Sequence, residues 1–463
     1  MENYKKNIRR VFWLYFALFA ALAIYLAKFI FVDSESIITS PYNPRLKLQS
    51  DSMTRGEILD ANGKQLAYTK DGKRSYPLAE AAAHIVGYAD SNIGFYGVEA
   101  RYNFNMQNAH NEIIQRVLNL AADAEIMGDS PVMTIDADLQ TYIYNQLSGK
   151  SAAVVMEPST GKILAMVSRP GFNPEDLDTN YQELSAKAKD TPLLNRATQG
   201  LYPPGSIFKI VTAAAGMEFM DIKNFSYVCY GEAEFDGKAV RCYNSTVHGE
   251  EALLKAFSQS CNTYFCQAGL NIGSENLRSI AERLYFNVSI PYPLEYSVSS
   301  FSLDKGSPVS EIVDTAIGQG KTQISPLLAV MITAAIANGG IMMSPYVVDH
   351  LQTYDGQITH KSMPSLMRMV FTPEEASDLR QYMTAVTTDG TGKNAAVGGV
   401  SIAAKTGTAE HGSPYEPEPD HGWYTAFFPA ENPQYAISIL VENSGGSGAI
   451  MPVARNIINY LIS

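Results

Sequence analysis

A serine and a lysine three positions apart, Ser206 and Lys209, stand where chain breakers give way to an uninterrupted apolar run. The Pro-Pro-Gly of residues 203–205 cannot continue a helix, whereas nothing in residues 207–217 would interrupt one, so we expect a helix to begin near Ser206. Residues three apart on a helix lie roughly 5 to 6 Å apart on one face. The spacing therefore predicts that the Lys209 amine reaches the Ser206 hydroxyl, as a base reaches its nucleophile.

The neighbours of Lys209 are almost all apolar, which indicates a helix buried in a core. A buried amine is costly to keep charged, and its neutral form can accept a serine proton. The same four-residue pattern occurs at Ser159–Lys162, in a glycine-containing turn, and at Ser302–Lys305, in a polar loop. In isolation such a pair is better explained as a helix N-cap and a lysine that extends to solvent, so the assignment depends on residues further along the chain.

Two later groups supply what a serine acyl-transfer site needs, namely a proton carrier, donors for an oxyanion and a cation for a negatively charged substrate. Ser260 and Asn262 lie two apart, so one side chain can carry protons while the other holds an amide; Ser274-Glu-Asn276 matches this pattern by chance. The string Lys405-Thr406-Gly407-Thr408 occurs once, at the end of an alternating strand pattern. Its glycine would let a substrate backbone approach the strand edge.

No metal or cofactor site is predicted. His411 and His421 flank a loop rich in acidic residues, but their spacing matches no usual zinc pattern. We interpret this loop as solvated charge.

The four cysteines allow three pairings and lie at Cys229, Cys242, Cys261 and Cys266. The segment between the first two contains Asp236-Gly237, a hairpin signal, so its ends should lie side by side and pair if they are oxidised. The alternative is two buried free thiols. Cys261 and Cys266 are five apart on one predicted helix and should point in different directions.

Residues 11–27 carry no charge, and with residues 29–32 they form an apolar span of about 33 Å that only Lys28 interrupts. The positive-inside rule then predicts a cytoplasmic tail at 1–10, a transmembrane helix at 11–32 and everything after about residue 33 outside the cell. A cleaved signal peptide is the alternative, but the run is long for one and no small-residue cleavage site follows. The flanking charges are Lys5, Lys6, Arg9 and Arg10 before the span, and Asp33 and Glu35 after it.

Two regions follow the span. Residues 33–130 are predicted to form a small pedestal domain, with a strand, turn and strand in 55–67 and helices at 79–86 and 110–124, and no residues there suggest chemistry. Residues 131–463 show strands, a block of helices and strands again, which indicates an α+β fold. Helices are expected at 136–147, 252–270, within 310–340 and at 450–462; strands are expected at 152–157, 163–167, 399–408, 423–428 and 435–443.

Length and charge exclude some functions. The 463 residues are enough for two or three domains, and 46% hydrophobic with 18% charged residues is ordinary. The net charge of -12 argues against a nucleic-acid-binding surface and against broad adhesion to anionic lipid.

Taken in order, Ser206-x-x-Lys209, Ser260-x-Asn262 and Lys405-Thr406-Gly407 form the signature set of penicillin-binding proteins and serine β-lactamases. Over nearly its whole length the chain resembles a class B penicillin-binding protein, a resemblance that implies an antiparallel sheet flanked by helices, an all-helical lobe and a dimerisation-like pedestal. The likeness extends to residues 55–60, 202–206, 318–320, 325–326, 405–409 and 423–429.

The resemblance implies a peptidoglycan D,D-transpeptidase that cross-links stem peptides and is inhibited by β-lactams. Ser206 is then acylated by the D-alanyl-D-alanine end of a stem peptide, with Lys209 as its base. Ser260 and Asn262 relay protons and position substrate. The terminal carboxylate would be held by Lys405, Thr406 and Thr408, and the backbone N–H groups of Ser206 and Thr408 would form the oxyanion hole.

The sequence departs from the family pattern in two ways. Cys261 places a thiol in the middle of the Ser-x-Asn motif, and the pedestal is too short for a glycan-polymerising domain. The resemblance therefore implies a partner, a multi-spanning polymerase of the shape, elongation, division and sporulation type. Three alternatives remain: a β-lactamase, which needs neither anchor nor pedestal; a D,D-carboxypeptidase, which shares every residue named; and an inert wall-synthesis scaffold, which the intact motif set disfavours.

Overall fold

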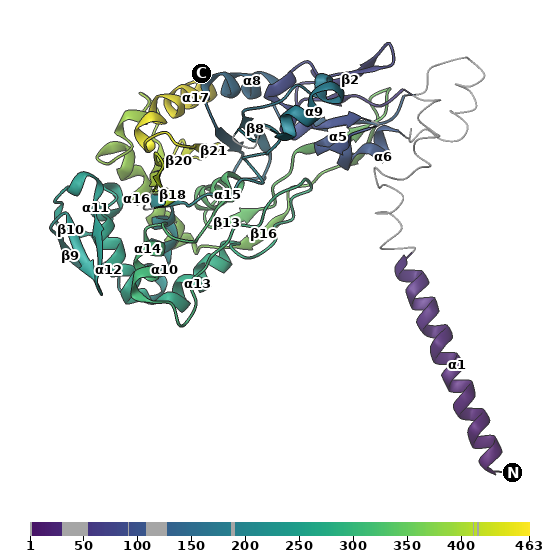
Figure 1. The fold of residues 1–463 in the computed structure, drawn as a ribbon, viewed down its shortest axis with the longest axis horizontal. Helices are drawn as coiled ribbons and strands as arrows, with labels where there is room; N and C mark the ends of the chain where they lie inside the picture. The colour runs from purple at the N-terminus through teal and green to yellow at the C-terminus, as the bar shows by residue number, and fades with distance from the viewer. Residues whose placement is uncertain are drawn as a thin grey trace.

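The computed structural model describes residues 2–29, 54–90, 92–107, 127–186, 190–410, 412–413 and 416–463. It contains one N-terminal apolar helix and a mixed body of sheets and helices, which confirms the predicted α+β class (Figure 1). The helix predicted at 110–124 lies outside the described residues.

The N-terminal helix α1 (Glu2–Lys28) contains a candidate membrane span at Tyr4–Lys28, 25 residues with a mean hydropathy of 1.9. At 1.5 Å per residue this segment is about 37 Å long, enough to cross a hydrocarbon core of about 30 Å. The helix begins earlier than predicted, because no breaker separates the basic residues from the apolar run. Lys5, Lys6, Arg9 and Arg10 are consequently helical.

The predicted strand, turn and strand near residue 60 are present as β1 (Ile58–Leu59) and β2 (Gln65–Lys70), which pair antiparallel. The Asp60 carboxylate accepts hydrogen bonds from the backbone N–H groups of Asn62 and Lys64 and so closes the turn. The rest of this region consists of short elements: β3 (Lys73–Ser75), a 3-10 turn (Ala79–Ala81), α4 (Ala83–Val86), β4 (Tyr88–Asp90), β5 (Gly94–Tyr96), α5 (Gly97–Arg101) and α6 (Asn103–Met106).

A six-stranded sheet joins this N-terminal region to the remainder of the chain. Its order is β15-β14-β6-β1-β2-β3, where β6 is Ser130–Met133, β14 is Val348–Gln352 and β15 is Ile358–Lys361. Strands from both sides of the predicted boundary at residue 130 are therefore hydrogen-bonded into one sheet.

The largest antiparallel sheet has the order β17-β20-β21-β7-β8. Alternate residues of β7 face different layers: Val154 packs in the core that contains α15 (Pro326–Ala337), and Val155 packs in the core that contains α8 (Ala137–Gln146) and α17 (Met451–Ile462). The strands are β7 (Ser151–Met156), β8 (Ile163–Arg169), β17 (Ala403–Ala409), β20 (His421–Phe428) and β21 (Tyr435–Val441).

A helical lobe lies next to the sheet that contains β20 and β21 (Figure 1), and its helix α16 packs against β17. It comprises α10 (Lys209–Phe219), α11 (Leu253–Ser258), α12 (Asn262–Ile272), α13 (Ser274–Arg283), α14 (Val309–Ala316) and α16 (Pro373–Thr388). Two small sheets lie against it, β9 (Ser226–Cys229) with β12 (Gly249–Ala252), and β10 (Glu232–Phe235) with β11 (Lys238–Arg241). The further elements are α9 (Leu177–Ala186), β13 (Ile341–Met343), β16 (Leu366–Met369), β18 (Gly412–Ser413) and β19 (Glu416–Pro417).

The prediction of one helix over 252–270 is wrong, because the chain breaks between α11 and α12. Ser260 lies in this break with φ 57, the left-handed region. The Cys261 N–H donates to the Ala256 carbonyl at 2.9 Å and closes the turn. The break directs the Ser260 side chain toward two buried lysines.

Candidate active site

Ser206 lies in a 3-10 turn, Gly205–Phe208, that runs directly into α10, whose first residue is Lys209. The predicted helix start is thus present, with one tighter turn before it. The turn is held from outside, since Trp423 Nε1 donates to the Pro203 carbonyl at 2.9 Å and the Gly205 N–H donates to the Gly318 carbonyl at 2.8 Å.

Gly205 has a conformation and a contact that exclude any side chain. Its φ is 52, and a Cβ there would lie 2.4 Å from the carbonyl oxygen of Thr408. The backbone of the Ser206 turn therefore packs against β17 with no room for a side chain at Gly205. This contact sets the position of the Ser206 N–H relative to β17.

Lys209 is fully buried. Its amine donates to the Ser260 carbonyl at 2.7 Å, the Asn262 Oδ1 at 2.7 Å and the Ser260 Oγ at 3.1 Å. Among the described residues it makes no hydrogen bond to the Ser206 hydroxyl, so the predicted direct contact is not formed in this structure. Burial lowers the pKa of Lys209 to about 8, which is the direction that a general base needs.

Lys405 lies on β17 of the five-stranded sheet and also contacts Ser260. Its Nζ donates to the Ser260 Oγ at 3.0 Å and to the Thr406 carbonyl at 3.1 Å, and the side chain is fully buried. Burial and then the neighbouring Lys209 hold the pKa of Lys405 well below its usual value. The Ser260 hydroxyl oxygen is consequently shared by two buried amines.

Asn262 begins α12, and its side chain is oriented from both ends. Its Nδ2 donates to the Arg241 carbonyl at 2.7 Å, which leaves the amide oxygen facing Lys209. The structure thus brings Lys209, Ser260 and Asn262 together with Lys405, as the three motifs predicted. Ser206, Ser260 and Asn262 are each half-buried, whereas the two lysines are inaccessible.

Thr406, Gly407 and Thr408 also lie on β17, which is an edge strand of the five-stranded sheet. The Thr406 Oγ1 is 2.6 Å from the Thr391 Oγ1, and the Thr408 Oγ1 accepts from the Ser447 N–H at 3.3 Å. Thr391 and Ser447 were not identified from the sequence, because no motif marks them and only the fold brings them to β17.

Close packing around Gly407 leaves little room for a side chain at this position. A Cβ there would lie 2.9 Å from the Trp423 Cβ and 3.1 Å from the Ile207 Cγ2. The glycine thus lets β17 pack against the turn that carries Ser206.

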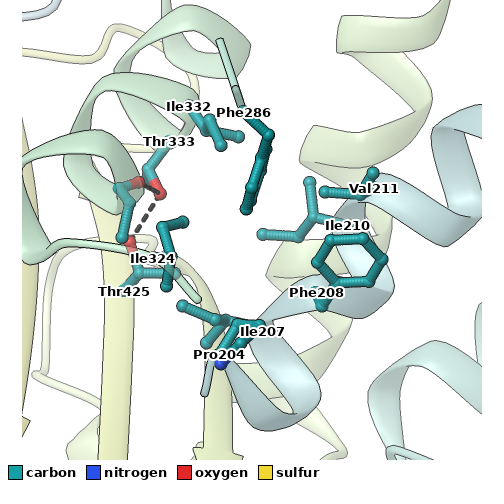
Figure 2. A pocket seen from close by; sticks show the side chains of 11 residues that line it. Pro204, Ile207, Phe208, Ile210, Val211, Phe286, Ile324, Ile332, Thr333 and Thr425 are labelled. Atoms are coloured by element: carbon teal, nitrogen blue, oxygen red, sulfur yellow. Dashed lines mark hydrogen bonds between the residues drawn. The ribbon is translucent and has the colours of Figure 1, made fainter. Parts of the chain in front are cut away.

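An apolar pocket lies beside the turn (Figure 2). Its two polar side chains, Thr333 and Thr425, hydrogen-bond to each other. The predicted catalytic side chains are not among the described residues that line it, so the pocket belongs to the packing that supports the turn. The lining residues are Pro204, Ile207, Phe208, Ile210, Val211, Phe286, Ile324, Ala329, Ile332, Thr333 and Thr425.

The predicted hairpin between Cys229 and Cys242 is formed by β10 and β11, and it brings the two sulfurs to 3.6 Å. Both are free thiols, since a disulfide would hold the sulfurs about 2.05 Å apart. Their pairing on oxidation stays a prediction. Cys261 turns toward Cys242, whereas Cys266 turns away and donates to the Val313 carbonyl at 3.4 Å. Of the two loop histidines, His411 lies outside the described residues and His421 is buried beside Tyr202.

The fold and the arrangement of serines and lysines define the class of protein. The family model of the penicillin binding protein transpeptidase domain matches residues 151–459, and that of the penicillin binding protein A dimerisation domain matches residues 55–130. This chain belongs to the penicillin-binding protein transpeptidase family, as a class B member, which confirms the resemblance seen in the motifs. The predicted domain limits, 33–130 and 131–463, stay predictions.

Known relatives align along most of the chain. The peptidoglycan D,D-transpeptidase PbpA of Mycobacterium tuberculosis is 31% identical over 456 residues, covering 92% of each protein. Stage V sporulation protein D of Bacillus subtilis is 28% identical, covering 87% of this chain and 64% of that protein. The crystal structure of PBPA from M. tuberculosis matches with a TM-score of 0.82 and 31% identity, over 89% of this chain and 100% of that one.

A further structure is informative about the site. The ceftriaxone acyl-enzyme complex of penicillin-binding protein A from M. tuberculosis matches with a TM-score of 0.83 and 30% identity, over 90% of this chain and 100% of that one. That relative is acylated by a β-lactam.

Proposed function

We propose that this chain is a peptidoglycan D,D-transpeptidase in which Ser206 is the nucleophile. The observation that carries the proposal is the convergence of Lys209 and Lys405 on the Ser260 hydroxyl. Lys209 stands three residues after Ser206, at the start of α10. Two buried amines with lowered pKa values and a shared hydroxyl form a proton path, which a structural site does not need. The family and the acylated relative support the same reaction.

In the first half-reaction the Ser206 oxygen attacks the carbonyl carbon between the two D-alanines, and the neutral Lys209 amine accepts its proton. The tetrahedral intermediate collapses as the peptide C–N bond breaks. Ser260, hydrogen-bonded to Lys209, passes its proton to the departing D-alanine amine and takes the Ser206 proton from Lys209, which becomes neutral again. An ester between Ser206 and the donor peptide remains.

In the second half-reaction an acceptor amine attacks this ester. Its proton returns through Ser260 and Lys209 to the Ser206 oxygen as the ester C–O bond breaks. A cross-linked peptide is released and the enzyme is restored. Water in place of the amine would give carboxypeptidase activity from the same residues.

The donor peptide would bind along the outer edge of β17, because an edge strand offers unpaired backbone groups to an extended peptide. Lys405, Thr406 and Thr408 would hold its terminal carboxylate, and Gly407 keeps β17 against the Ser206 turn. The backbone N–H groups of Ser206 and Thr408 would stabilise the oxyanion, since the close contact of Gly205 with Thr408 holds the two segments together.

Labelling with a fluorescent penicillin tests the nucleophile. Ser206→Ala should lose covalent labelling, and Lys209→Ala should lose nearly all of it, while circular dichroism stays that of the folded protein. Lys162→Ala and Lys305→Ala, at the two other Ser-x-x-Lys matches, should label at the wild-type rate. Equal labelling of Ser206→Ala and wild type would disprove the assignment.

The anchor extends the proposal to the membrane. The basic residues at the start of α1 favour a cytoplasmic N-terminus and an extracytoplasmic catalytic region, with the exposed apolar face of α1 packing against a separate multi-spanning glycan polymerase. Glycan length and cross-linking should be followed separately, with and without a co-expressed polymerase. This chain alone should cross-link peptides without lengthening glycan; long glycan made by the purified chain would refute the partnership.

A further inference from the structure

Three cysteines and a histidine meet beside the Ser260–Asn262 segment. Cys229 ends β9, Cys242 follows β11, His248 precedes β12, and Cys261 is the residue just before α12. The three sulfurs and one ring nitrogen of this cluster all lie within 4.8 Å of one another. The cysteines are buried and the histidine is half-buried, which leaves one side for entry.

Three of the six distances within the cluster match the edges of a coordination tetrahedron. Cys229 and Cys242 have sulfurs 3.6 Å apart, Cys242 and Cys261 have sulfurs 3.8 Å apart, and the Cys229 sulfur is 3.4 Å from the His248 Nδ1. A zinc ion bound at about 2.3 Å from sulfur and about 2.0 Å from nitrogen sets tetrahedral S–S and S–N edges of about 3.8 and about 3.5 Å. Three thiolates and an imidazole are a closed set typical of structural zinc.

A disulfide between Cys229 and Cys242 would account for only two of these four groups. It would leave the Cys261 thiol and the His248 ring without a function in the same buried space. Two hydrogen bonds hold the cluster in place: the Gly231 N–H donates to the Cys229 sulfur at 3.4 Å, and Lys255 Nζ donates to the backbone carbonyl of His248 at 2.9 Å.

An ion would add a further connection to the local fold. The β9–β12 and β10–β11 pairs are two-stranded sheets, which depend on packing against other elements for their stability. Large side chains in this region face solvent, with Tyr230 74%, Tyr243 70% and Val247 64% exposed. One ion would join both small sheets to the start of α12.

We propose that Cys229, Cys242, His248 and Cys261 bind one structural Zn²⁺ ion that fixes the Ser260–Asn262 segment in its catalytic position. Cys261 lies between Ser260 and Asn262, so a bond to its sulfur holds both neighbours in place. Arg241, whose carbonyl orients Asn262, is the neighbour of Cys242 and is held by the same ion. Binding displaces the three thiol protons to solvent, and no oxidation or reduction takes place.

Metal content of the purified full-length protein in detergent tests the proposal. Elemental analysis and native mass spectrometry of protein prepared without chelator should find one Zn²⁺ per chain. Replacement by Co²⁺ should give the sulfur-to-cobalt charge-transfer bands and intense visible bands of a tetrahedral thiolate site. His248→Ala and Cys242→Ser should weaken Zn²⁺ binding by more than the roughly 10- to 100-fold that loss of an outer hydrogen-bond partner causes.

Matched controls distinguish loss of the metal site from loss of the fold. Cys266 is a buried thiol of α12 that lies outside the cluster, so Cys266→Ser should keep the full equivalent of Zn²⁺. Ser206→Ala should also keep it, so failure of the acyl-transfer assignment and failure of the metal site are distinguishable. Chelation should slow penicillin acylation of wild type, and added Zn²⁺ should restore it.

Two results would overturn the proposal. The first is a reduced, folded wild-type protein that binds no Zn²⁺ at micromolar excess and shows no cobalt charge-transfer bands. The second is peptide mapping that finds a Cys229–Cys242 disulfide in protein purified without oxidant, with Zn²⁺ unable to bind after mild reduction.

Discussion

The Nζ of Lys405 lies 3.0 Å from the hydroxyl oxygen of Ser260, although the two residues are 145 positions apart in the chain. The contact joins the edge strand of the large sheet to the break between α11 and α12. The same hydroxyl oxygen accepts a hydrogen bond from Lys209 of α10. One oxygen therefore links the five-stranded sheet to the helical lobe.

The first prediction concerns this hydroxyl. Ser260→Ala should lower the rate of acylation by penicillin by roughly 10²- to 10⁴-fold, because the proton path from Lys209 to the leaving group is cut. Stopped-flow fluorescence of penicillin binding measures the rate. Ser274→Ala is the matched control, since Ser274 belongs to the chance Ser-x-Asn match and starts α13. A wild-type rate in Ser260→Ala would remove Ser260 from the mechanism.

The second prediction concerns pH. Burial lowers the pKa of Lys209 to about 8, against a smaller raising effect of Cys261 and Cys242. The neutral amine is the base, so the acylation rate should rise with pH, with a midpoint near 8, and level off above it. Below the midpoint it should fall about tenfold per pH unit, as the neutral fraction does. A rate that is constant from pH 6 to pH 9, in protein that stays folded, would contradict Lys209 as base.

The third prediction tests whether acylation depends on the close contact of Gly205 with Thr408 or only on the left-handed backbone of Gly205. Gly205→Ala should slow acylation by about 10²-fold or more, because its Cβ would lie 2.4 Å from the Thr408 carbonyl and displace the turn. Gly356→Ala has a similar left-handed backbone, with φ 83, but nothing within 4 Å of the new Cβ, so it should acylate at the wild-type rate. Equal rates for the two variants would show that the close contact is not needed.

The fourth prediction concerns the N-terminal region. Glu99 is fully buried between Arg55 and Arg74, with an oxygen 2.6 Å from Arg55 and another 2.7 Å from Arg74. Burial raises the pKa of the Glu99 carboxyl, but the two guanidinium groups outweigh it and hold the pKa below its usual value. Glu99→Gln leaves two cations without a counter-ion and should destabilise the protein by about 3 to 5 kcal/mol.

Urea unfolding followed by circular dichroism measures this loss. Lys321→Met, which breaks an exposed pair with Glu311, is the control and should cost less than about 1 kcal/mol. Stability of Glu99→Gln within that range would mean that the buried cluster contributes little.

The sequence by itself determined the local features. The Pro-Pro-Gly breaker predicted where the Ser206 helix begins, Asp236-Gly237 predicted the hairpin that brings Cys229 to Cys242, and the motif order predicted the family. These signals are local because breakers and turn residues restrict φ and ψ wherever they stand.

Only the tertiary structure decided how the site is assembled. No glycine or proline marks the break at Ser260, and the apolar pattern runs through it, so the sequence predicted one helix where packing imposes two. Thr391 reaches Thr406 through the packing of α16 on β17, and His248 reaches the three cysteines at spacings that match no usual zinc motif. Contacts between distant residues depend on how whole elements pack, which no local pattern encodes.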